Sequence, residues 1–398
     1  MTDTINQHTL DFIRQHQHDD VRQLALQGSK NPEVDIAMAL QQIAGRQTAR
    51  KKLPSWAMID DVLYPPHLNM EQCSSEQTAR YKAQLAGSGD TYADLTGGLG
   101  VDFYWMSQHF KQRYYIEQNA DLCALAEHNF RVLNHPCSVC CCDTAAHLTE
   151  MPHCDVIFLD PARRNEHGGR TYDIKDCTPN VLELLPLLMA KADKVILKLS
   201  PMLDWRKAVD ELKLVSEVHI VSVDNECKEL LLVLEQAQRP LRLVCVNNDS
   251  IFEVPNKDQF AMPHSAPQRT ANCQKQIAPS YLYEPNASIM KAGCFAALEQ
   301  QFPVRQLSAN SHLFLSSVEI EDFPGRHFQI CAISSTNKQA LKDALNGIDR
   351  ANITIRNFPL SVEQLRKKLH LKDGGDTYIF ATTAKNNQHQ LYICRKIG

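Results

Sequence analysis

The sequence predicts an α/β fold built on a doubly wound, mostly parallel sheet that ends in an antiparallel hairpin. From Thr91 onward, short apolar runs alternate with amphipathic stretches, which is the pattern of strands and helices around a parallel sheet. A glycine-rich turn follows the first of these apolar runs. The alternation then breaks at two apolar runs joined by the short polar segment 224–229, with no helix between them.

The first 85 residues predict a helical cap. Residues 35–43 and 75–85 have the apolar spacing of amphipathic helices, and three prolines punctuate the segment between them.

Residues 86–250 predict the main domain. We expect helices at 101–109, 120–133 and 181–190, and strands at 92–95, 114–117, 139–142, 156–160, 195–199, 218–223 and 230–234. The last two strands form the hairpin. A terminal hairpin after five strand–helix units is typical of the seven-stranded, Rossmann-like sheet of class I methyltransferases, whereas dinucleotide dehydrogenases usually continue with parallel strands.

Two smaller α+β domains are expected beyond a linker at about 250–280, which is rich in Pro, Gln, Asn and Ser. We place them at 280–336 and 337–398. The whole chain has a net charge of −4, but residues 337–398 contain eleven Lys and Arg against five Asp and Glu, a balance of +6. A basic end beside an acidic body is a weak indication of an RNA or DNA partner.

The remaining composition indicates a cytoplasmic protein. The polar N-terminus does not have the pattern of a secretory signal, and no apolar run reaches the length of a membrane helix. The fourteen cysteines are therefore expected to be reduced. Cys137, Cys140, Cys141 and Cys142 are interpreted as small buried apolar residues and not as metal ligands, because consecutive residues of a strand point to alternate faces.

The glycine-rich turn predicts a cofactor site. Asp94 ends a strand, and the turn that opens the next helix contains Thr96, Gly97, Gly98 and Gly100. Such glycines let the backbone approach a ligand closely. The third glycine of the dinucleotide fingerprint is missing, because Phe103 occupies its place. An acidic residue at this strand end suits the cationic S-adenosyl-L-methionine better than a pyrophosphate.

Two further acidic residues end the next two strands. Glu117 is positioned to accept the ribose hydroxyls, and Asp143 to reach the adenine amino group. Because parallel strands end at one edge of the sheet, we expect Asp94, Glu117 and Asp143 to face one crevice. The alternative for Asp143 is that it caps the helix that follows it.

The fourth strand ends in Asp160, Pro161, Ala162 and Arg163, where methyltransferases acting on bases or amino groups have their Asp/Asn-Pro-Pro motif. Asp160 is the candidate acceptor of a hydrogen bond or proton and belongs to both the cofactor and catalytic sets. Pro161 makes the turn rigid, and Arg163 with Arg164 is a candidate phosphate contact or a solvated pair. Lys198 is a further catalytic candidate; both it and Asp204 could equally be structural, Asp204 as a helix cap.

The same motif resembles that of RNA carbon-5 uridine methyltransferases, whose chemistry needs a cysteine nucleophile. The corresponding stretch here, residues 198–204, contains no cysteine. Direct transfer to nitrogen or oxygen is therefore the favoured prediction.

Taken together, these motifs resemble a bacterial family of methyltransferases with a C-terminal THUMP-like domain. The resemblance covers nearly the whole chain, and the segments that carry it are 71–76, 94–100, 159–163, 200–204, 283–286, 356–359 and 373–376. It implies a small ferredoxin-like segment at 280–336 and an RNA substrate, tRNA or rRNA. The alternatives left open are a small-molecule or protein acceptor, and an inactive RNA-binding scaffold.

Overall fold

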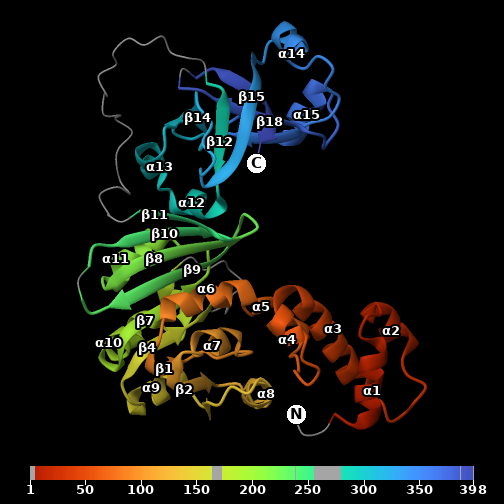
Figure 1. Cartoon of the computed structure of the whole chain (residues 1–398), viewed down its shortest axis with the longest axis vertical. Coiled ribbons are helices and arrows are strands. Elements are labelled where there is room, and N and C mark those ends of the chain that lie inside the picture. The colour runs from red at the N-terminus through yellow and green to blue at the C-terminus, as the bar shows by residue number, and fades with distance from the viewer. Residues whose placement is uncertain (1–4, 164–172, 238, 255–278, 386, 398) are drawn as a thin grey trace. The chain divides into compact units, whose positions relative to one another are not determined.

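The computed structural model describes residues 5–163, 173–237, 239–254, 279–385 and 387–397 (Figure 1). They form two compact units, one made of residues 1–218 and 229–239 and the other of 219–228 and 240–398. None of the helices described is long and apolar enough to span a membrane.

The N-terminal region is helical, as predicted. Its helices are α1 (Gln7–His16), α2 (Val21–Gln27), α3 (Ile36–Lys52), α4 (Pro54–Ala57), α5 (His67–Gln72) and α6 (Glu76–Ala86). Asp35 and Ser75 cap α3 and α6, because each side chain accepts a hydrogen bond from an amide of the first helical turn. Helix α3 is longer than predicted, since its polar residues Gln42 and Arg46 are also buried.

The first unit is built on a mostly parallel sheet. Its strands are β1 (Gly89–Asp94), β2 (Phe110–Glu117), β3 (Ser138–Cys141), β4 (Cys154–Leu159), β7 (Ala192–Leu199), β8 (Val215–Val223) and β9 (Glu226–Glu235). These strands are consecutive members of a sheet, in the order β3-β2-β1-β4-β7-β9-β8; among the described residues, the sheet has nine strands in all, two more than predicted. β1 pairs in parallel with β2 and β4, and β9 runs antiparallel to β7. The predicted fold class and its terminal hairpin are confirmed.

The helices around this sheet are α7 (Val101–Met106), α8 (Ala120–Val132), α9 (Thr144–Glu150), α10 (Val181–Lys191) and α11 (Trp205–Leu212). Aromatic side chains join them to the strands: Phe103 of α7 packs edge-on against Tyr115 of β2 and lies 5.0 Å from the ring of Phe130 of α8. The sequence patterns did not predict the small antiparallel pair of β5 (Ala162–Arg163) and β6 (Cys177–Thr178). They also did not predict the short helical turn η1 (Ile174–Asp176), which directly precedes β6.

The interpretation of the cysteine cluster as buried residues was wrong. β3 is an edge strand of the sheet, so Cys140 is only half-buried and Cys141 is exposed. Cys137 and Cys142 are also only partly buried.

The second unit contains the hairpin of β10 (Arg242–Asn247) and β11 (Ser250–Val254). The first residues of the expected linker are therefore a strand, while 255–278 lie outside the described residues. A seven-stranded sheet follows, in the order β13 (Arg305–Gln306), β14 (Phe314–Ser316), β12 (Tyr281–Pro285), β15 (Gly325–Ser335), β18 (His389–Ile397), β17 (Thr377–Thr383) and β16 (Asn352–Arg356). Its helices are α12 (Ala287–Ala292), α13 (Phe295–Gln301), α14 (Lys338–Ala344) and α15 (Val362–Leu369).

A buried ion pair network ties parts of this second sheet together. Glu284 of β12 is 4% exposed, and its carboxylate accepts hydrogen bonds from Arg326 of β15 and Arg356 of β16. The contact joins residues 72 positions apart in the sequence, Glu284 and Arg356.

Candidate functional site

The turn between β1 and α7 brings its backbone close to neighbouring aromatic rings. A Cβ added at Gly97 would lie 2.1 Å from Cε2 of Tyr115, and one at Gly100 would lie 2.5 Å from Cζ of Phe130. Gly98 and Gly100 have φ angles of 56° and 84°, in the left-handed region that favours glycine. The three glycines are thus required by packing and by backbone conformation.

Asp94 lies at the carboxyl end of β1 and is 1% exposed. Its Oδ1 accepts a hydrogen bond from the Thr96 amide at 2.9 Å. Burial raises the pKa of Asp94 well above the ordinary value, and the carboxylates of Asp102, Asp160 and Glu117 raise it further against the lowering effect of the amide. A buried carboxyl in these surroundings is stabilised by a proton or by a bound cation.

Glu117 connects the end of β2 to the glycine-rich turn. Its Oε2 accepts a hydrogen bond from the Gly98 amide at 2.9 Å, and its Oε1 accepts one from the Asn119 amide at 2.8 Å. The Tyr115 hydroxyl of the same strand donates to the Gly98 carbonyl at 2.5 Å. The carboxylate is therefore held in a fixed orientation beside the turn.

Asp160 follows β4 and begins the Asp-Pro turn. Its amide donates to Oγ1 of Thr96 at 2.7 Å, so the turns after β1 and β4 are joined. Its Oδ2 lies 2.5 Å from Nζ of Lys198, and its side chain is 38% exposed. Burial lowers the pKa of Lys198, but the carboxylates of Asp160 and Asp102 outweigh that effect and hold the pKa above its ordinary value. Lys198 is therefore an ammonium group and not a base.

The remaining predicted residues have simpler surroundings. Asp143 is exposed and caps α9, because its Oδ1 accepts hydrogen bonds from the Ala145 and Ala146 amides. Asp204 similarly caps α11. Pro161 is buried in the turn. The backbone of Arg163 belongs to β5, while its side chain and all of Arg164 lie outside the described residues.

Sequence reasoning missed a buried charge cluster next to Lys198. It consists of Lys82 of α6, Asp102 of α7 and Glu229 of β9, with Ser74 as a neutral partner. Lys82 lies three residues after Ala79 and four before Ala86, on the buried face of α6. A lysine at a core position of an amphipathic helix is the signal that could have identified it.

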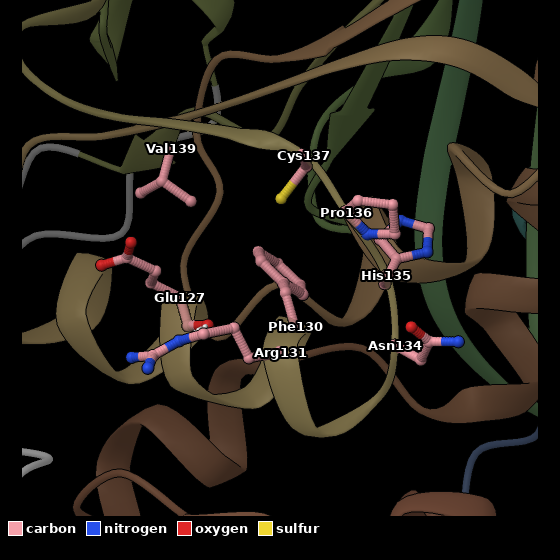
Figure 2. Close-up of a pocket in the computed structure, with 8 residues that line it drawn as sticks. All are labelled: Glu127, Phe130, Arg131, Asn134, His135, Pro136, Cys137 and Val139. Carbon is pink, nitrogen blue, oxygen red and sulfur yellow. Dashed lines mark hydrogen bonds between the residues drawn. The ribbon is translucent and has the colours of Figure 1, made fainter.

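A separate pocket of about 300 Å³ lies between α8 and the start of β3, and Figure 2 shows Phe130 and Cys137 pointing toward one another in it. His135, in its lining, is held neutral because burial and nearby Arg113 lower its pKa to about 4. The pocket is at the amino end of β3, whereas the carboxylates above follow the carboxyl ends of strands, where open α/β sheets bind ligands. It is therefore not the predicted cofactor crevice.

The described cysteines are also candidate metal ligands by residue type. Within the part of the chain that the structure describes, no group of three or more His, Cys, Asp or Glu is arranged to hold a metal ion.

Comparison with known proteins identifies the C-terminal domains. Residues 325–396 match the family described as THUMP domain-like, and residues 281–324 match a ferredoxin-like domain family. The crystal structure of a candidate methyltransferase from Porphyromonas gingivalis W83 is similar over 98% of both chains, with a TM-score of 0.85 and 29% identity. No curated protein matches the sequence.

This chain has the fold of that methyltransferase, and its C-terminus matches a THUMP-like domain. Two other solved structures match it only in part. A candidate class I S-adenosylmethionine-dependent methyltransferase from Listeria monocytogenes matches with a TM-score of 0.40 and 10% identity, over 62% of this chain and 94% of that one. A candidate RNA methyltransferase from Pyrococcus horikoshii matches with a TM-score of 0.33 and 15% identity, over 44% and 92%.

The THUMP-like match begins at β15, so it includes Arg326, while the ferredoxin-like match includes Glu284. The Glu284 ion pairs therefore join the two matched domains.

Proposed function

We propose that this chain transfers the methyl group of S-adenosyl-L-methionine to a base nitrogen in structured RNA, tRNA or rRNA, in the cytoplasm. The observation that carries the proposal is the arrangement of Asp94, Glu117 and Asp160 after β1, β2 and β4. Thr96 hydrogen-bonds to Asp94 and Asp160, and Gly98 hydrogen-bonds to Glu117, so the three carboxylates belong to one connected site.

The residues present fit this cofactor. Asp94 is buried beside the turn of Thr96, Gly97, Gly98 and Gly100, and on losing its proton it can balance the amino-acid ammonium. The fixed carboxylate of Glu117 suits the ribose hydroxyls, and Asp143 is assigned to the adenine amino group. When bound, the cofactor supplies an electrophilic methyl group on a sulfonium.

Asp160 is the group proposed to orient the methyl acceptor. Lys198 pairs with the Oδ2 atom of Asp160, which follows β4 on the turn fixed by Pro161. An ionised carboxylate has acceptor positions beyond the one that a single ammonium occupies. Asp160 can therefore accept a hydrogen bond from the N–H of an amino group, direct the nitrogen toward the methyl group and take up the proton that transfer releases. Arg163 is assigned to a phosphate of the acceptor.

Support for RNA comes from the second unit. The THUMP-like match covers 325–396, and residues 337–398 have a charge balance of +6. On α15, Lys367 and Lys368 are exposed, whereas Arg366 is paired with Asp373. Exposed lysines suit phosphate contacts. They also suit a solvated helix face, so a small-molecule or protein acceptor and an inactive RNA-binding scaffold remain the alternatives.

The first test is calorimetric titration with S-adenosylhomocysteine, with NAD as the comparison ligand. We expect micromolar binding of the first and none of the second. RNA from a strain that lacks the gene should then accept radiolabelled methyl groups from S-adenosyl-L-methionine in the presence of the protein. Asp160→Ala should bind the cofactor product nearly normally and eliminate transfer. Transfer at the wild-type rate would make the Asp160 turn structural, and cofactor binding without RNA methylation would favour the alternatives.

A further inference from the structure

The buried charge cluster lies behind the Asp160–Lys198 pair, not in the crevice itself. Lys82 is fully buried, and its Nζ lies 2.6 Å from Oε2 of Glu229, 3.0 Å from Oδ1 of Asp102 and 2.9 Å from Oγ of Ser74. Ser74 donates its own hydroxyl proton to Oδ2 of Asp102 at 2.7 Å. The helical cap therefore contributes a cation and a hydroxyl group to the interior of the methyltransferase domain.

Asp102 connects Lys82 to the active-site lysine. Its Oδ1 faces Lys82, and its Oδ2 lies 3.5 Å from Nζ of Lys198. Lys198 in turn lies 2.5 Å from Oδ2 of Asp160. The two lysines thus share Asp102, and the closer partner of Lys198 is Asp160.

The balance of charge makes this arrangement sensitive to Lys82. Two lysines face three carboxylates, so the removal of either lysine leaves buried carboxylates without a cation. An uncompensated buried charge recruits the nearest counter-ion, since the interior screens charges poorly. The nearest one to Asp102 is the ammonium of Lys198.

We propose that Lys82 is a positioning residue for methyl transfer: by neutralising Asp102 and Glu229 it keeps Lys198 on Asp160. The proposal rests on the proposed function for its effect on catalysis, but the placement of Lys198 is a structural claim that stands by itself. It gives the helical cap an indirect role in the active site, because Lys82 and Ser74 belong to the cap.

The test uses the full-length protein with Lys82→Met, which keeps the length of the side chain and removes the charge. In its crystal structure, we expect Nζ of Lys198 to move from Asp160 to hydrogen-bond distance of Asp102. With RNA from the deletion strain as substrate, kcat should fall by up to about 100-fold, the size of effect that a displaced catalytic group can have. The loss should lie in kcat and not in KM for the cofactor, because Lys82 is not among the residues assigned to the cofactor.

The matched control is Lys194→Met. Lys194 of β7 also contacts α6, through a hydrogen bond from its Nζ to the Leu85 carbonyl at 3.1 Å, but within the described part of the chain it forms no ion pair with Asp102, Asp160 or Glu229. This variant should keep the wild-type kcat and the Lys198–Asp160 pair. If Lys82→Met does not fold, Lys82→Met combined with Glu229→Leu removes the pair together and still leaves Asp102 to recruit Lys198.

Either of two results would overturn the proposal: a variant structure in which Lys198 still holds Asp160, or an unchanged kcat despite a displaced Lys198. If the wild-type protein methylates no RNA, the proposed function fails, and the variant structure alone decides whether Lys82 positions Lys198.

Discussion

Asp94→Asn should separate cofactor affinity from folding. Asparagine preserves the size of the side chain and can still accept a hydrogen bond from the Thr96 amide, but it has no charge to balance an ammonium group. Since Asp94 is only 1% exposed, solvent does not screen its interaction with a bound cation. A buried hydrogen bond to a charged group contributes about 1.5–3 kcal/mol. At about 1.4 kcal/mol for each factor of ten, the Kd for S-adenosylhomocysteine should rise roughly 10- to 150-fold.

The assay is calorimetric titration of wild type and variant at one pH and one salt concentration. Asp90→Asn is the matched control, because Asp90 lies at the opposite end of β1 and pairs with exposed Lys111. The control should bind like wild type. Folding of Asp94→Asn should be intact or improved, because the variant no longer has to bury a carboxyl among other carboxylates. A Kd within about threefold of wild type, less than 1 kcal/mol, would refute the assignment of Asp94 to the ammonium.

The same affinity should depend on pH, because burial holds the pKa of Asp94 well above the ordinary carboxyl range. At a pH between the ordinary carboxyl pKa and the raised pKa of Asp94, the free protein keeps the proton on Asp94, and cofactor binding must release it. The affinity should therefore rise with pH in this window. This pH dependence should be absent in Asp94→Asn. Gly97→Ala should destabilise the fold by about 1–3 kcal/mol in urea, because the added methyl overlaps buried Tyr115. Lys198→Met should cost about 3 kcal/mol by the same assay, since Asp160 and Asp102 lose a buried cation. Glu284→Gln should lower the free energy of unfolding of the second unit by about 1–3 kcal/mol, measured by thermal unfolding, because two arginines lose their shared carboxylate. An unchanged unfolding temperature would show that these ion pairs do not contribute to stability.

The order of elements and the positions of the strand ends could be predicted from the sequence. Apolar periodicity is a local property, and it placed β1, β2, β4 and β7 within a few residues of their observed bounds. Because the carboxyl ends of parallel strands lie at one edge of a sheet, these strand positions were sufficient to predict that Asp94, Glu117 and Asp160 lie at the same edge. The missing third glycine and the hairpin after β7 also excluded a dinucleotide fold from local signals alone.

Only the tertiary structure decided how these groups are charged and held. The pairing of Lys82 with Glu229 joins residues 147 positions apart, and no local pattern encodes such a contact. The exposure of the β3 cysteines depends on the place of that strand at the edge of the sheet, which its own four residues do not reveal. Periodicity is set by neighbours along the chain, whereas burial and charge pairing are set by neighbours in space.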